Sequence, residues 1–285
     1  MAVYREALSP ITFEDREFLH PVLRSLPEGI SEFSFANIYL FREKYGYQWS
    51  MSEDGVLLFT GIDSSGPFCM LPLALPSEKK IHELLSRYRM IKCVNESQAE
   101  DLKELGFSII DDRDNYDYLY SRNDLAELPG RKFHKKKNLI RGFVHRYTYE
   151  ARPLLEDYTA DAMEILRDWR SQRDEPGDFK AAQEALERME ILQLCGLIYY
   201  VDGSPAAYLL GEEMARGTMF AVHFEKAIAE YKGLYQFVNQ SFASILPDKY
   251  ELINREQDLG IEGLRKTKLS YNPSGFVRKY RAYRP

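Results

Sequence analysis

The sequence predicts an α+β protein made of two halves that share one order of elements. The length of 285 residues suits two domains that each bury a core. A hydrophobic fraction of 45% beside a charged fraction of 29% is ordinary for globular proteins. The order helix, helix, three-strand meander, helix, strand, helix, strand occurs twice along the chain. We expect each half to form a mixed, mostly antiparallel sheet flanked by helices.

In the first half, apolar residues at helical spacing alternate with short runs of strand-forming residues. The expected helices cover 13–26, 33–44, 77–88 and 97–105. The expected strands cover 47–51, 56–61, 68–73, 90–94, 107–110 and 116–120. Asp54-Gly55 and the segment 63–66 are hairpin signals between the first three strands, and Gly46 ends the second helix.

The second half repeats this pattern. Its expected helices cover 157–171, 179–188, 233–246 and 260–266, and its expected strands cover 194–201, 206–213, 218–224, 250–253 and 276–282. Asp202-Gly203 takes the place of the Asp-Gly turn of the first half. We therefore expect an N-terminal domain over 1–122, a basic linker helix within 123–149, and a C-terminal domain over 150–285 that carries the site. The two domains should superpose.

The composition favours a soluble cytoplasmic protein. Arg5 and Glu6 follow the first residues with no apolar run behind them, which is unlike a secretory signal. An uninterrupted apolar stretch of about 18 residues, which a membrane span needs, is absent from the sequence. Cys69, Cys93 and Cys195 lie in apolar runs without a CxxC pair, which predicts buried thiols in a reducing compartment. The five histidines lack metal-ligand spacing, so we expect no metal site.

The net charge of −6 hides two basic segments. The segment 131–146 holds seven basic residues and no acidic one, and the segment 264–285 holds seven more, again without an acid. Such segments are either solvated helix faces or sites for an anionic partner. Within the linker helix, Lys135, Lys136 and Asn138 are candidates for contact with a phosphate-rich ligand, because clefts form between domains.

Two stretches resemble a known family. They are YLYSRNDL at 118–125 with FHKKKN at 133–138, and NREQDLGIEGLRKTKLSYNP at 254–273. Both resemble an uncharacterised bacterial family grouped with the C-terminal domain of phosphatidylglycerol lysyltransferase, and the element order resembles the GNAT acyltransferase superfamily. The resemblance covers most of the chain and implies two GNAT-like domains in tandem.

The resemblance also implies an activity. Relatives with this fold move an aminoacyl group from aminoacyl-tRNA to a lipid headgroup or a peptide amine. The implied partners are tRNA and an anionic lipid headgroup or a peptide, and the resemblance places Lys268 where a lysine faces the substrate. The lysyltransferase carries transmembrane helices ahead of this region. Because the present sequence has no apolar stretch of that length, the resemblance does not imply that it is attached to a membrane. No resident cofactor is implied with certainty; the donor is aminoacyl-tRNA or acyl-CoA.

The position of the coenzyme A motif departs from the pattern of ordinary GNAT enzymes. Those enzymes have Arg/Gln-x-x-Gly-x-Gly/Ala, whose small residues let backbone N–H groups approach a pyrophosphate. Here Glu230 replaces the basic or amide residue, Gly233 is kept, and Tyr235 replaces the small one. Lys232 offsets the acid in part. We therefore expect weak binding of acetyl-CoA, while Gly233 alternatively does no more than open a helix.

Polar residues after the strand 250–253 are the main catalytic candidates. Asn254 and Arg255 line the expected cleft, and Glu256 or Asp258 orients an incoming amine or takes its proton. Lys268 stabilises the developing oxyanion or a donor phosphate. The alternative is a polar loop in which Asp258 caps the next helix, with Lys268 a solvated lysine.

His223, Tyr208, Asn239 and Tyr271 are weaker candidates for the same cleft, and His223 is alternatively a satisfied strand histidine. Three functions remain open: an acyltransferase using aminoacyl-tRNA or a similar phosphorylated donor, an ordinary acyl-CoA-dependent N-acetyltransferase, and a non-catalytic binding protein on a decayed tandem fold. The sequence leaves the oligomeric state unknown.

Overall fold

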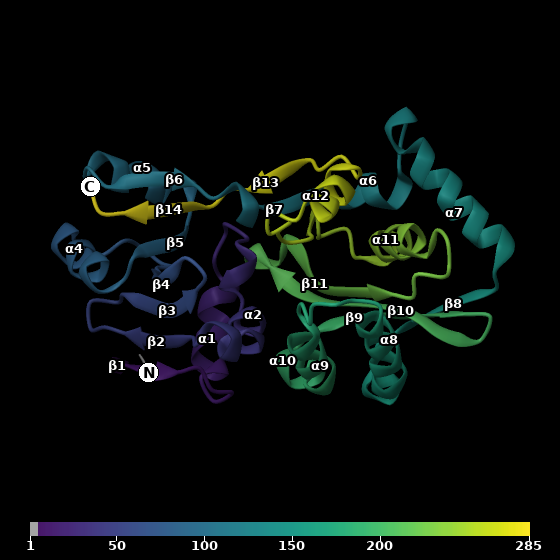
Figure 1. Cartoon of the computed structure of the whole chain (residues 1–285), viewed down its shortest axis with the longest axis horizontal. Helices are drawn as coiled ribbons and strands as arrows, with labels where there is room; N and C mark the ends of the chain where they lie inside the picture. The colour runs from purple at the N-terminus through teal and green to yellow at the C-terminus, as the bar shows by residue number, and fades with distance from the viewer. Residues whose placement is uncertain (1–4) are drawn as a thin grey trace. The chain divides into compact units, whose positions relative to one another are not determined.

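The computed structural model describes residues 5–285, and Figure 1 shows its elements. The chain forms two compact units. Unit 1 comprises Met1–Asp117, Gln257–Glu262 and Phe276–Pro285; unit 2 comprises Tyr118–Glu256 and Gly263–Gly275. Two short segments from the end of the sequence thus belong to the unit built from its beginning, whereas the expected boundaries placed them with the second half.

Unit 1 is a seven-stranded sheet with helices on both faces. Its strands are β1 (Arg5–Pro10), β2 (Gln48–Met51), β3 (Leu57–Asp63), β4 (Gly66–Met70), β5 (Met90–Val94), β6 (Ser108–Asp111) and β14 (Tyr280–Tyr283). Its helices are α1 (Arg16–Arg24), η1 (Ser31–Phe33), α2 (Phe35–Leu40), α3 (Arg42–Tyr45), α4 (Glu78–Arg87), α5 (Glu96–Glu104) and η2 (Arg113–Asn115). The strand order is β1-β2-β3-β4-β5-β14-β6, and only β4 and β5 pair in parallel.

Alternation along the strands divides the core of unit 1 between two faces. Trp49 of β2 is fully buried and stacks on Phe18 of α1, with ring centres 5.7 Å apart. Cys69 of β4 and Ile91 of β5 instead join Leu84 of α4 in a second apolar cluster. Both faces are covered, which explains why β4 and β5 read as short apolar runs.

Unit 2 is a second seven-stranded sheet. Its strands are β7 (Asp117–Ser121), β8 (Tyr149–Pro153), β9 (Cys195–Val201), β10 (Ser204–Met214), β11 (Met219–Ala227), β12 (Leu252–Asn254) and β13 (Gly275–Val277), in the order β13-β7-β12-β11-β10-β9-β8. Its helices are α6 (Arg122–Glu127), η3 (Arg131–Phe133), α7 (His134–Arg146), η4 (Glu156–Tyr158), α8 (Thr159–Ser171), α9 (Phe179–Glu187), α10 (Met189–Leu192), η5 (Ala215–Gly217), α11 (Leu234–Ile245) and α12 (Glu262–Leu269).

Helices cover both faces of the second sheet. In Figure 1, α8, α9 and α10 lie on one face of β9, β10 and β11, and α11 lies on the other. The hairpin between β9 and β10 turns at Asp202 and Gly203, whose φ angles of 49° and 83° favour glycine and short polar residues. Phe237 of α11 packs against Phe143 of α7, with ring centres 4.9 Å apart. The basic helix α7 is therefore seated on α11.

The architecture confirms the predicted fold class: a mixed α+β chain with two mixed sheets flanked by helices. Four details differ. The expected strand over 276–282 is divided into β13 and β14, which belong to different sheets. The expected helix over 33–44 is interrupted at Phe41, where α2 ends and α3 begins. The strands β1 and β8 and the helix α6 were not anticipated. Cys195 is exposed rather than buried, because it opens β9 at the end of the strand, while Cys69 and Cys93 are buried as expected.

Candidate functional site

A β-bulge in β11 places His223 in unit 2. Across the pair of strands, Leu210 faces Phe224 and Gly211 faces Val222, so His223 between them has no partner in β10. Bulges of this kind re-aim one side chain and are common beside active sites. Gly211 is required here, because a Cβ at this position would lie 1.9 Å from the carbonyl oxygen of Ala221. The sequence thus brings the two strands unusually close beside the bulge.

His223 lies between two carboxylates. Its Nε2 is 2.9 Å from Oε1 of Glu212, and its Nδ1 is 2.7 Å from Oε1 of Glu256. Burial disfavours the charged imidazolium, but the two carboxylates outweigh it and raise the pKa of His223 to about 10. Both ring nitrogens therefore carry hydrogen and donate at neutral pH. The side chains of Glu212 and His223 are almost inaccessible, whereas that of Glu256 is 18% exposed, so the cluster reaches solvent at Glu256.

The backbone around Glu256 is held in a left-handed turn. Its φ is 55°, its N–H donates to Oδ1 of Asn254 at 2.7 Å, and its carbonyl oxygen accepts from Nζ of Lys268 at 3.3 Å. The same Nζ donates to the carbonyl oxygen of Arg255. The buried Lys268 is thus committed to two backbone carbonyls. This geometry favours a positioning role for Lys268 over the direct role that the sequence suggested.

A second polar cluster lies where β11 and β12 separate. The two strands pair in parallel only over three residues each. Beyond that point Nη2 of Arg255 donates to Oε2 of Glu225 at 2.6 Å, and Nδ2 of Asn239 donates to Oε1 of Glu225 at 2.6 Å. The guanidinium of Arg255 also lies 5.2 Å from the ring centre of Tyr271. An ion pair therefore bridges the opening between the strands.

The bridged opening contains one small cavity. It measures about 10 Å³, room for a single water molecule, and it is lined by Leu125, Leu209, Val222, Glu225, Asn239, Phe242, Ile253 and Arg255. Within residues 5–285, Nη1 of Arg255 is buried without a hydrogen-bond partner. An unsatisfied cationic donor is costly in a protein interior. Arg255 Nη1 is therefore the unsatisfied donor of this cluster.

Gly233 opens α11 with a φ of 97°. A Cβ at this position would lie 2.4 Å from the carbonyl oxygen of Leu139 in α7. The glycine is needed because α7 packs against the turn. Lys232 is exposed, and the hydroxyl of Tyr235 contacts the backbone of Ala227. The geometry agrees with the helix-opening interpretation of Gly233.

The basic helix α7 presents most of its charged residues to solvent. Lys135 and Asn138 are exposed. Lys136 is half-buried; its Nζ donates to Oγ of Ser270 at 2.7 Å and lies 4.0 Å from the ring centre of Tyr271. Burial, with a contribution from nearby Arg255, lowers the pKa of Lys136. Lys136 thus connects the face of α7 with the ring that Arg255 contacts.

Two predicted residues lie apart from these clusters. Asp258 belongs to unit 1, is fully buried, accepts from the N–H of Gly260 at 2.9 Å and lies 3.4 Å from Nη1 of Arg113. Its side chain bonds within the turn that precedes α12, whereas the alternative had Asp258 cap that helix. Tyr208 is fully buried in β10, and within the described chain its hydroxyl has no hydrogen-bond partner. Burial raises its pKa.

Sequence reasoning missed two residues of the clusters, Glu212 and Glu225. Each interrupts or follows a strand that is otherwise apolar. A carboxylate in such a run is rarely buried without a partner, and that signal was available. Among residues 5–285, no group of three or more His, Cys, Asp or Glu side chains is arranged to hold a metal ion.

Comparison with known proteins places the chain in a family. The family of the phosphatidylglycerol lysyltransferase C-terminal region matches residues 23–283. The chain belongs to this family. A conserved protein of unknown function from Bacteroides thetaiotaomicron has the same fold over 98% of this chain and 99% of its own, with 31% identity and a TM-score of 0.87.

More distant structures share the fold. One is the C-terminal domain of a protein from Agrobacterium fabrum assigned as a lysylphosphatidylglycerol synthetase. The match covers 95% of the present chain and 92% of that domain, at 14% identity and a TM-score of 0.63. The crystal structure of FemX matches 98% of this chain and 97% of its own, at 10% identity and a TM-score of 0.58. An uncharacterised protein of Mycoplasmoides gallisepticum is 22% identical over 173 residues, a match that spans 54% of that protein's length.

The family match relates the chain to the C-terminal region of phosphatidylglycerol lysyltransferase, and the more distant structures share its fold. Every helix within residues 5–285 is too short or too polar to cross a lipid bilayer.

Proposed function

We propose that unit 2 transfers an aminoacyl group from aminoacyl-tRNA, or a similar phosphorylated donor, to an amine or hydroxyl of a lipid headgroup or peptide. The acceptor atom attacks the ester carbonyl carbon and forms a new bond to it. The carbon–oxygen bond to the donor ribose then breaks. The acceptor loses one proton, and the departing ribose oxygen gains one.

The observation that carries this proposal is the hydrogen-bonded series of side chains Glu212, His223 and Glu256. Glu256 is its partly exposed end and therefore the carboxylate that an acceptor reaches. The imidazolium of His223 fixes one oxygen of Glu256, and Glu212 fixes the imidazolium. Glu256 thus acts as the base for the acceptor proton, and His223 and Glu212 act as positioning residues.

The donor's carbonyl oxygen needs a positive or N–H-rich contact in the transition state. Lys268 is already committed to two backbone carbonyls. Arg255 carries a buried Nη1 with no hydrogen-bond partner in residues 5–285. We therefore assign the oxyanion contact to Arg255, and to Lys268 the task of holding the turn that carries Arg255 and Glu256.

A phosphate-rich donor is favoured over acyl-CoA by the packing of α7. The carbonyl oxygen of Leu139 lies against Gly233, and the ion pair of Arg255 with Glu225 crosses the opening between β11 and β12. These contacts oppose the diphosphate and the extended arm of coenzyme A. The outer face of α7, with Lys135 and Arg141 exposed, instead offers cations to an RNA backbone.

The test is a transfer assay with the full chain. Each of a set of radiolabelled aminoacyl-tRNAs is mixed with phosphatidylglycerol vesicles or an amine-bearing peptide, and label leaving the RNA for the acceptor is measured. We expect transfer with one donor and acceptor pair, and a loss of about 100-fold or more in Glu256→Gln. Glu251→Gln, an exposed carboxylate near the start of β12, is the matched control and should keep the wild-type rate.

Three outcomes would contradict the proposal. Transfer from acetyl-CoA alone would establish the ordinary N-acetyltransferase function. Wild-type rates in Glu256→Gln would remove the base. Binding of a donor without transfer to any acceptor would support a non-catalytic binding protein.

A further inference from the structure

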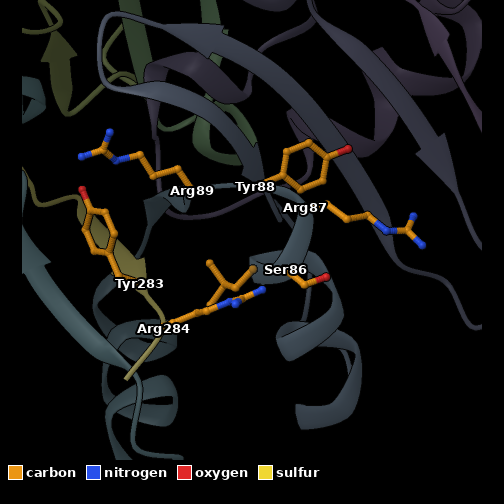
Figure 2. A pocket seen from close by; sticks show the side chains of 7 residues that line it. Ser86, Arg87, Tyr88, Arg89, Tyr283 and Arg284 are labelled. Carbon is orange, nitrogen blue, oxygen red and sulfur yellow. The ribbon is translucent and has the colours of Figure 1, made fainter.

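Unit 1 carries an open depression with three arginines at its rim. The depression has a volume of about 430 Å³ and is lined by Leu85, Ser86, Arg87, Tyr88, Arg89, Tyr283 and Arg284. Figure 2 shows Arg284 extending across the depression near Ser86, with Arg87 and Arg89 extending to either side. The lining residues come from the end of α4, the turn into β5 and the end of β14.

The charge of this surface is one-sided. The three arginines are exposed, and the lining contains no carboxylate. Among residues 5–285, none of the three side chains forms an ion pair. The whole chain carries a net charge of −6, so this cluster is not the by-product of a basic composition. Like charges gathered without partners are unfavourable unless an anion joins them.

A simpler interpretation accounts for only part of the cluster. Arg87 is the last residue of α4, where a cation stabilises the helix dipole. Arg89 lies beyond the helix, with its N–H bonded to the carbonyl oxygen of Pro67, and Arg284 follows a strand of distant sequence. The dipole of α4 therefore does not account for the positions of Arg89 and Arg284. Their gathering around one hollow requires a different reason.

The shape and the rings indicate the ligand. A guanidinium group binds a phosphate through two parallel N–H···O hydrogen bonds. Tyr88 and Tyr283 are half-buried and line the same hollow, and aromatic side chains are the usual stacking partners of nucleobases. Binding to a bilayer surface is strengthened by exposed apolar residues that insert into it. The only aliphatic residue of the lining, Leu85, is 4% exposed, so a membrane is the less suitable partner. We propose that this depression binds the phosphate and base of a nucleotide unit, either free or at the end of an RNA strand.

This site lies in unit 1 and is independent of the transfer site in unit 2. Its test uses the full chain and isothermal titration with adenosine, AMP, inorganic phosphate, a short single-stranded RNA carrying a 5′-phosphate, and vesicles of equal parts phosphatidylglycerol and phosphatidylcholine. The variant is Arg87→Gln/Arg89→Gln/Arg284→Gln. The matched control, Lys79→Gln/Lys80→Gln/Lys103→Gln, removes the same charge from exposed positions of α4 and α5 in unit 1.

We expect AMP to bind more tightly than adenosine or inorganic phosphate, and the arginine variant to lose at least tenfold in affinity for AMP. The control should change it by less than about twofold. If the RNA also binds here, the arginine variant loses three phosphate contacts. The negative slope of log affinity against log salt concentration should then become shallower by roughly 2, at about 0.7 per contact. The Glu256→Gln variant should bind AMP normally, which separates this site from the transfer site.

Four results would overturn the proposal. Equal affinity for adenosine and AMP would show that phosphate is not recognised. Equal losses in both triple variants would show that only net charge matters. Binding of vesicles but not AMP would assign the surface to membranes, and no binding of any probe would leave the arginines without this role. Circular dichroism of both variants shows whether each is folded.

Discussion

Each unit buries an ionic cluster, and the clusters around Lys279 and His223 differ in the cation at their centre. In unit 1, Nζ of the fully buried Lys279 lies 2.7 Å from Oδ1 of Asp117 and also pairs with Glu32. Ser31 donates both its hydroxyl and its N–H to Asp117, each at 2.9 Å. Asp117 is completely inaccessible, so its charge is satisfied from within the unit.

Both clusters reach solvent at one carboxylate, Glu32 in unit 1 and Glu256 in unit 2, whose side chains are 16% and 18% exposed. Burial opposes the charge on both His223 and Lys279, and in both cases neighbouring carboxylates outweigh it and raise the pKa. The clusters differ in their cation: the amine of Lys279 holds the inaccessible Asp117, whereas the imidazolium of His223 joins two carboxylates through its two ring nitrogens. The following variants test that distinction, beginning with the largest effect.

Lys279→Met tests the cluster of unit 1. It removes the cation and leaves Asp117 charged and inaccessible, so we expect the free energy of unfolding to fall by about 3–5 kcal/mol. Urea denaturation provides the measurement. Adding Asp117→Asn should recover part of the loss, because the uncompensated charge is then removed. A loss in the single variant no larger than that of a surface substitution would show that the charge of Asp117 does not depend on Lys279.

Asp258→Asn and Glu256→Gln compare a buried carboxylate of unit 1 with the accessible one of unit 2. Asp258 accepts from Gly260 and faces Arg113, so its replacement should cost about 1–3 kcal/mol of stability. Glu256→Gln keeps the shape and one hydrogen bond, so we expect a smaller stability loss together with loss of transfer. Melting temperatures and the transfer assay give the two readouts. The reverse ranking would contradict the assignment of the base.

The pH dependence of stability sharpens the comparison further. The pKa of His223 is raised from about 6.5 to about 10 in the folded state, so its contribution to stability is fully present below about pH 6.5 and is lost as the pH rises through about 10. The difference in unfolding free energy between wild type and His223→Gln should therefore shrink over this range. Urea denaturation at a series of pH values measures it, and a constant difference would argue against a raised pKa.

Gly142→Ala should give the smallest effect, and in the opposite direction. Gly142 lies within α7 and is exposed, and a Cβ there would meet nothing within 4 Å. Alanine is favoured over glycine in a helix interior by about 1 kcal/mol, so the substitution should stabilise unit 2 by that amount. Thermal unfolding tests this. A loss of stability would mean that α7 is strained at this position.

The local signals of the fold were readable from the sequence. The Asp-Gly turns and the helix end at Gly46 lie where the residues predicted them, because positive φ angles select glycine there. β1 and β8 were missed because five of the six residues of β1, and four of the five of β8, are exposed or only partly covered polar or small residues without alternation. The insertion of β14 between β5 and β6 depends on pairing between distant segments, which local patterns do not encode.

The candidate site follows the same division. The run Asn254 to Glu256 was recognisable because polar residues seldom follow a buried strand without reason. The partners Glu212 and His223 come from other strands, so only the fold joins them to Glu256. The contacts of Lys268 could not be inferred, since a lysine in a basic stretch gives no sign that its amine will be buried against two carbonyl oxygens.

The position of β14 has a consequence for synthesis on the ribosome. β5 and β6 of unit 1 are not adjacent in their sheet; β14 lies between them and bonds to both, and it is translated after almost all of unit 2. The emerging N-terminal segment therefore carries two unpaired strand edges throughout the translation of unit 2. Exposed edges of this kind recruit other strands, so the segment that is made first completes its fold last and depends most on chaperones while it waits.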